Sequence, residues 1–250
     1  MKKTKVNFTI KSIRGKRPIN QDSLACSYNF NKEFIAVVCD GVGSVPGSEH
    51  ASRLISHRFV TNWSKTGHIE TPTAWFKETL KVAMEELIQY VKDFNTDAIS
   101  TTLAVLMVIG DKFYCYNIGD TRIYGFQQHD LTHTVKQYTY DHNYYNYLVA
   151  QEASKDVINA NEAKWHSLVN YIDPTSPKRA KFDANSGTIT QKTYFLLCTD
   201  GLYAYVRDNE KYEIITRKYI PLALKLNLLN TKAIRNGSDD NVSGILVVVK

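Results

Sequence analysis

The sequence lacks the features that would place the protein in a membrane or outside the cell. No apolar run in its 250 residues approaches the roughly 18 residues that cross a bilayer. The first residues carry lysines but not the apolar stretch of a signal peptide. The four cysteines are far apart, and three lie inside apolar runs, which suits small buried side chains in a reducing compartment. We therefore expect a cytoplasmic protein that does not associate with membranes.

Motifs for nucleotide, zinc or nucleic-acid binding are also missing. Gly41, Gly43 and Gly47 follow an apolar run, but the Gly-Lys-Ser/Thr of a P-loop is not there, so we interpret them as a flexible turn. No aspartate has a histidine at the close spacing of a zinc site. The net charge is +6, but the lysines are scattered, whereas a nucleic-acid enzyme needs a focused basic groove. We therefore expect no nucleic-acid partner.

The apolar pattern predicts one domain, residues 1–250, that combines strands with helices. Neither a repeat nor a linker interrupts the chain. Short turns such as Gly110-Asp111 and Gly119-Asp120 favour antiparallel pairing. Alternating or apolar runs predict strands at Val6–Ile13, Ser23–Asn29, Phe34–Cys39, Thr102–Ile109, Lys112–Ile118, Arg122–Gln127, Thr193–Cys198 and Ile245–Val249.

Helical periodicity covers four other segments. Residues 48–63 and 73–94 each place their apolar side chains on one face, and weaker signals cover 209–218 and 221–235. This order of elements predicts a β-sandwich with helices packed outside. Residues 128–185 are rich in tyrosine and weakly periodic. They could form a partner surface, but ordinary packing of a lid segment is the preferred interpretation.

Aspartates occur where strand-like runs begin or end. Asp40 and Asp200 follow apolar runs, Asp120 lies in a tight turn, and Asp239 and Asp240 precede the last strand. Each alone is an ordinary turn signal. Strands that end together would gather these carboxylates, whose like charges raise one another's pKa values. A hard divalent cation such as Mg²⁺ or Mn²⁺ resolves that conflict.

Two such cations would give the cluster a hydrolytic chemistry. They can bridge a water, lower its pKa and neutralise phosphoryl oxygens while the resulting hydroxide attacks phosphorus in line. Arg17 is the candidate for orienting the phosphate, because a guanidinium binds phosphate oxygens with two donors. Arg122, next to the aspartate turn, is interpreted as a structural ion-pair partner, and Asp239 as a turn residue.

Six motifs carry a resemblance to a known family. RPINQDS, VVCDGVGSVPGSEHAS, STTLAVLMV, NIGDTRIY, LLCTDGLYAYV and SDDNVSGILVVV occur in this order across nearly the whole chain. Together they resemble the motifs of metal-dependent protein phosphatases, the type 2C serine/threonine group, in its short bacterial form. The resemblance implies an α+β fold, a four-layer αββα sandwich of two antiparallel sheets flanked by helix pairs, with a two-metal centre in a cleft at one end.

The resemblance also implies a set of metal ligands. Asp40 would bridge two Mn²⁺ or Mg²⁺ ions, and the carbonyl of Gly41 would bind the first. Asp200 and Asp240 would bind the second. Asp120 with Asp200 would form a weaker third site.

Other residues would support these ligands. Asp22 would hold metal-bound water, Arg17 would clamp the substrate phosphate, and Asn241 would fix the turn that presents Asp240. The chain departs from the family pattern at Gln21, where glutamate is common, and at Val42, where some members carry a histidine.

These departures leave the general acid unassigned. Water and His50 are the two candidates. The flap region within residues 128–185 matches the family poorly.

The activity implied is hydrolysis of phosphoserine and phosphothreonine in proteins, opposite a serine/threonine kinase in bacterial signalling, by a monomer. The alternative is a catalytically weak phosphatase-like domain that binds a phosphoprotein or a regulatory partner. Such relatives normally lose a metal aspartate, and this chain has all of them. A phosphoesterase acting on small phosphates or nucleic acid ranks last.

Overall fold

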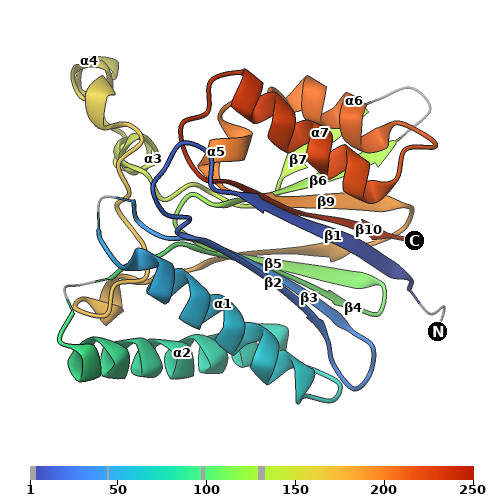
Figure 1. The fold of residues 1–250 in the computed structure, drawn as a ribbon, viewed down its shortest axis with the longest axis horizontal. Helices are drawn as coiled ribbons and strands as arrows, with labels where there is room; N and C mark the ends of the chain where they lie inside the picture. Colours follow the sequence, from blue (N-terminus) through green and yellow to red (C-terminus); the bar gives the residue numbers. More distant parts are fainter. Residues whose placement is uncertain (1–3, 44, 97–98, 129–132) are drawn as a thin grey trace.

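Two antiparallel sheets form the centre of the protein in a computed structural model that describes residues 4–43, 45–96, 99–128 and 133–250 (Figure 1). Within these residues, sheet A has the order β1 (Val6–Ile13), β10 (Val242–Val249), β9 (Thr193–Cys198), β6 (Arg122–Gln128) and β7 (His133–Gln137). Sheet B has the order β2 (Asp22–Tyr28), β3 (Phe34–Asp40), β4 (Leu103–Ile109), β5 (Lys112–Ile118) and β8 (Asp183–Thr188).

The eight predicted strands are all present, and β7 and β8 are additional. Both additional strands lie at sheet edges. β8 has the sequence DANSGT and is largely exposed, so neither its composition nor its alternation marks it as a strand. It forms because its backbone pairs with that of β5. A local sequence pattern cannot predict this pairing.

Helices cover the outer face of each sheet, which confirms the αββα sandwich. The pair α1 (Ser48–Ser64) and α2 (Pro72–Phe94) packs on sheet B. On sheet A lie α5 (Asp200–Tyr203), α6 (Asp208–Thr216) and α7 (Leu222–Arg235). The predicted helix ends differ from these by one or two residues, except that the short α5 was not predicted.

The alternation of side chains along β3 shows how the layers are filled. Ile35, Val37 and Cys39 pack toward α1 and α2, whereas Phe34, Ala36 and Val38 pack between the two sheets. The sheets therefore share an apolar layer, and each has a second apolar layer under its helices.

The layer between the sheets becomes polar at one end. The inward series of β3 continues from Val38 to Asp40, and the series of β9 continues from Leu197 to Thr199. β10 enters the layer with Ser243 before Ile245. Because successive side chains alternate in direction, these strand ends place their polar side chains inside the sandwich.

The chain between β7 and β8 lies at this polar end. It contains α3 (Tyr144–Ala150), α4 (Lys155–Ala160) and the 3₁₀ turns Glu162–Lys164 and Pro177–Arg179 (Figure 1). Its tyrosines are partly packed and partly exposed. Tyr138 contacts Phe113 and Tyr145 contacts Trp165, whereas Tyr140, Tyr145 and Tyr147 are 40–48% exposed. Both the packing interpretation and the partner-surface interpretation of this segment therefore stay predictions. No helix among the described residues is both long and apolar enough to cross a membrane.

Truncation of Phe195 should test the layer between the sheets. This side chain is fully buried against Phe113 and Tyr138. Phe195→Ala should lower the free energy of unfolding by about 3–5 kcal/mol in a denaturant titration. Phe30 is 72% exposed, so Phe30→Ala should change it by less than about 0.5 kcal/mol. Equal effects of the two substitutions would contradict this layer assignment.

Candidate active site

Asp22 and Asp40 face each other across β2 and β3. They are directly opposed in the antiparallel register, and their carboxyl groups are in hydrogen-bonding contact. Asp22 also accepts a hydrogen bond from Thr199 Oγ1 at 3.1 Å and one from Ser243, both on the facing sheet. Burial, with a further contribution from the charge of Asp200, raises the pKa of Asp22 to about 7. The register between the two strands thus creates a carboxyl pair inside the sandwich.

Asp40 lies at the centre of the acidic cluster. Burial raises its pKa well above the ordinary aspartate value, and the charges of Asp22, Asp200, Asp120 and Asp240 raise it further. All five carboxyl groups are thus close enough to interact electrostatically. They form what we call the aspartate cluster (Asp22, Asp40, Asp120, Asp200 and Asp240).

Threonines hold the backbone beneath Asp40. Its N–H donates to Thr102 Oγ1 at 2.9 Å, and its carbonyl oxygen accepts from Thr102 N at 2.8 Å and Thr101 Oγ1 at 2.9 Å. Thr102 is bonded in turn to Thr121 Oγ1, at 2.6 Å, next to Asp120. These bonds join the end of β3 to the turn that carries the next aspartate.

Asp120 and Asp200 extend the cluster from the other strands. Asp120 lies between β5 and β6, and burial together with the charges of Asp200 and Asp141 raises its pKa to about 7. Asp200 opens α5 directly after β9, and burial and the charge of Asp240 raise its pKa. Glycine follows Asp200 for a steric reason, since a Cβ at Gly201 would collide with the carbonyl oxygen of Asn241.

The carbonyl oxygen of Gly41 lacks the bond that strand pairing would supply. Gly41 N–H donates to Gln21 O at 3.1 Å, so the two residues form a hydrogen-bonded pair in which Gln21 N–H would ordinarily donate back. Gln21 N–H donates instead to Asn241 Oδ1 at 2.8 Å. The Gly41 carbonyl, next to Asp40, is therefore left without this backbone donor.

Arg17 and Asn241 hold the loop that precedes β2. The Arg17 guanidinium pairs with Asp240 at 2.7 Å, and its side chain remains 42% exposed. Asn241 Nδ2 donates to Arg14 O at 2.7 Å and Ile19 O at 3.1 Å. Asn241 was expected to fix the turn at Asp240, and its N–H donates to Asp240 Oδ1 at 2.8 Å; its side chain in addition ties the 14–21 loop to β10.

The aspartate cluster fits hard divalent cations that keep part of their water shell. Among the residues that the structure describes, no three His, Cys, Asp or Glu side chains are placed to hold an ion by themselves. Mg²⁺ retains several waters and takes only one or two carboxylates from the protein. Buried carboxyls with raised pKa values, and a Gly41 carbonyl oxygen that Gln21 N–H does not bond, supply the oxygen ligands that such ions prefer.

A cavity of about 890 Å³ opens beside the cluster. Asp120, Asp200 and Asp240 line it on one side, and Tyr145, Trp165 and His166 line the other. His166 was not among the site residues predicted from the sequence, because no histidine there lies at the spacing of a ligand pair. Its charge lowers the pKa of Asp200, whereas burial and Asp240 raise that pKa. His50, the histidine considered as a general acid from the sequence, does not line this cavity; its ring stacks on Tyr90 of α2 at 5.6 Å.

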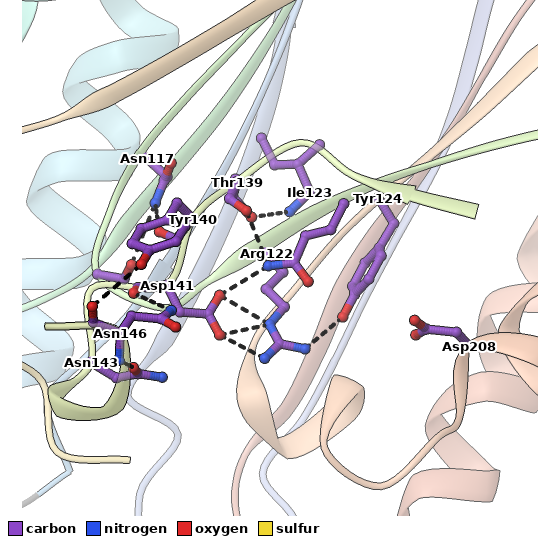
Figure 2. A network of polar contacts seen from close by, with 12 residues as sticks. Asn117, Arg122, Ile123, Tyr124, Thr139, Tyr140, Asp141, Asn143, Asn146 and Asp208 are labelled. Carbon is purple, nitrogen blue, oxygen red and sulfur yellow. Dashed lines mark hydrogen bonds and ion pairs between the residues drawn. The ribbon is translucent and has the colours of Figure 1, made fainter. Parts of the chain in front are cut away.

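Arg122 and Asp141, which both line this cavity, form a partly buried ion pair (Figure 2). Arg122 Nη2 donates to Asp141 Oδ2 at 2.6 Å and Nε donates to Oδ1 at 3.0 Å, and the guanidinium lies 3.8 Å from the centre of the Tyr203 ring. Nη1 donates to Tyr124 OH at 2.8 Å. Arg122 is therefore a structural ion-pair partner, as predicted, and its partner Asp141 was not found from the sequence.

The chain is similar to known phosphatases over nearly its whole length. Residues 11–228 match the family described as protein phosphatase 2C. A putative protein phosphatase of Mycoplasma genitalium is 31% identical over 96% of this chain and 94% of that protein. The serine/threonine phosphatase stp of Listeria monocytogenes is 27% identical over 91% and 89%. The catalytic domain of serine/threonine protein phosphatase PstP, solved with two manganese ions, has a TM-score of 0.79 at 21% identity, covering 98% of this chain and 99% of that one.

Metal removal should make the stability of the protein fall as pH rises. Asp22 and Asp120 have pKa values of about 7 in the fold against an ordinary 3.8, so the folded state holds more protons than the unfolded chain between these values. Their contribution to stability is then complete below pH 4 and lost by pH 7. Thermal unfolding in EDTA should show this slope, and Asp22→Asn with Asp120→Asn should flatten it. An unchanged slope in the double variant would contradict the assignment.

Loss of the Asn241 side chain should release the 14–21 loop. Asn241→Ala would leave Gln21 N–H and the carbonyls of Arg14 and Ile19 without their partner. The free energy of unfolding should fall by about 2–4 kcal/mol. Asn227→Ala, at an exposed position of α7, should change it by less than about 0.5 kcal/mol. A small effect at Asn241 would show that solvent replaces these bonds.

Proposed function

The chain belongs to the protein phosphatase 2C family and is a metal-dependent serine/threonine protein phosphatase, and we propose that the aspartate cluster is its catalytic centre. One observation carries this proposal: burial raises the pKa of Asp40, and the charges of four other carboxyl groups, all from separate strand ends, raise it further. Keeping uncompensated carboxylates close together costs free energy. A cation bound between them would offset that cost, which explains why the fold gathers them. We further propose that residues 1–250 act as a single domain, with 128–185 as its lid segment.

Five positions supply the proposed metal ligands. Asp40 would be the ligand shared by two Mn²⁺ or Mg²⁺ ions, the carbonyl oxygen of Gly41 would help to hold the first, and Asp200 and Asp240 would hold the second. Asp120, whose pKa responds to the charge of Asp200, forms a third site with it. Divalent ions in such a site supply Lewis acidity toward water and phosphoryl oxygens.

The protein's own groups orient the reactants. Asp22 accepts hydrogen bonds from Thr199 and Ser243, which leaves its carboxyl able to hold a water beside Asp40. Arg17, anchored on Asp240 and 42% exposed, offers its remaining donors to the substrate phosphate. We assign the protonation of the leaving group to a water molecule and not to His50, because the His50 ring is stacked on Tyr90 of α2.

The cellular setting is also a proposal. We infer a cytoplasmic monomer that acts on phosphorylated proteins opposite a serine/threonine kinase, without nucleic acid. The alternative, a phosphatase-like binding domain, is disfavoured because the structure brings all five aspartates together instead of leaving one outside the cluster.

Hydrolysis of a phosphothreonine peptide tests the function directly. Activity should disappear after EDTA treatment and return with Mn²⁺. Asp40→Asn should lower the rate by about 100-fold or more while the protein stays folded, because the shared ligand is lost. Asp93→Asn, on the exposed side of α2, is the matched control and should keep full activity. Full activity in Asp40→Asn would rule out the proposed centre. A folded wild-type protein that is inactive with every metal would favour the binding-domain alternative.

A further inference from the structure

A second cavity, of about 550 Å³, lies at the other end of sheet A and is strongly basic. The ends of β9 and β10 and the start of α7 enclose it, near the C-terminus in Figure 1. Five cationic side chains line it and, among the described residues, no acidic one does; the five are Lys192, Arg217, Lys218, Lys225 and Lys250. A concentration of one sign of charge around a cavity attracts ions of the other sign.

Lys225 is the buried member of this group. Its residue is only 3% exposed, and Nζ donates to Ile215 O at 2.6 Å and contacts Tyr194 OH at 3.5 Å. Both partners are neutral. Burial and the nearby charge of Lys192 lower the pKa of Lys225. Buried charges are normally paired, whereas the partners that the structure gives this ammonium group are a backbone carbonyl and a phenol hydroxyl.

Lys211 shows the contrast within the same helical layer. It is 1% exposed, and Nζ reaches the carboxylate of Asp208 at 2.8 Å while lying over the ring of Tyr124. These are the two buried lysines among the described residues. One has its counter-charge within the protein, and the other faces a basic cavity.

Two further features favour an anion in this cavity. Lys192 and Lys225 lie over the ring of the same residue, Tyr194, at 4.8 and 4.7 Å, so two like charges approach each other there. The helix α7 begins at Leu222, which lines the cavity, and no side chain caps its first turn. The free N–H groups and positive dipole end of a helix start also attract anions.

The cavity is distant from the aspartate cluster. β9 runs from Thr193, at the cavity, to Cys198, next to Asp200. Six residues of strand span about 20 Å. An anion here would therefore be separate from the substrate phosphate at the catalytic centre.

We propose that this cavity is a binding site for a phosphate-bearing anion. Several cations of both the ammonium and guanidinium type around one space suit a multiply charged oxyanion better than a single carboxylate. The volume exceeds that of a bare ion, so it also admits part of the group that carries the phosphate. Two sources share this chemistry: a free phosphate or small phosphate ester, and a phosphorylated side chain of a protein.

Amide NMR of the full chain with Mg²⁺ bound can locate the anion. Titration with inorganic phosphate should shift the amides of 220–225, and matched chloride should not. Lys225→Met should weaken the binding seen at these amides by about tenfold or more, while shifts at the catalytic end and peptide hydrolysis stay unchanged. Lys211→Met, which removes the other buried lysine, should retain the binding at 220–225.

The outcomes separate the alternatives. The proposal is overturned if neither inorganic phosphate nor a phosphonate analogue of a phosphoserine peptide shifts these amides more than chloride does, or if the shifts persist in Lys225→Met. If Lys225→Met does not fold, Lys192→Ala combined with Arg217→Ala, both at exposed positions, should weaken the binding instead, and no change there would overturn it. A response to inorganic phosphate assigns the site to free anions. A response only to the phosphonate analogue of the phosphoserine peptide, which the enzyme cannot hydrolyse, assigns it to phosphorylated proteins.

Discussion

The mutual repulsion of buried carboxyl groups is the constraint around which this end of the protein is built. Asp22, Asp40, Asp120 and Asp200 all have raised pKa values, and burial is the largest cause for each. Groups in this state are neutral or bind cations. A rigid frame is needed to keep them together, because a free chain would move the charges apart. The apolar layers of the sandwich supply that frame.

The frame acts through strand register and through bonds at the strand ends. Antiparallel pairing sets Asp22 opposite Asp40, and threonines join the end of β3 to the turn at Asp120. Asn241 takes over the N–H of Gln21, which leaves the Gly41 carbonyl beside Asp40 without its usual partner. The same Asn241 contact therefore has two results: it holds the loop before β2, and it leaves the Gly41 carbonyl oxygen without a bond from Gln21.

The sandwich carries opposite charge at its two ends. The acidic end gathers aspartates from both sheets, and the basic cavity gathers lysines at the ends of β9 and β10. β9 connects them, from Thr193 to Cys198. Each end has a side chain that is buried without full compensation from the protein, Asp40 in one and Lys225 in the other. Ions of opposite sign are suited to complete them.

Local patterns in the sequence determined the strands, the helix pairs and the aspartates at strand ends, because period-two and period-3.6 repeats mark which side chains are buried. The six ordered motifs added the family and its metal ligands. Only the tertiary structure decided that Arg122 pairs with Asp141, that His166 lines the cavity beside the aspartate cluster and that the buried Lys225 donates to the carbonyl oxygen of Ile215. These facts depend on contacts between segments distant in the chain, where no repeat or spacing records the partner. The exposed edge strand β8 went unpredicted for the same reason, since its pairing with β5 comes from the fold.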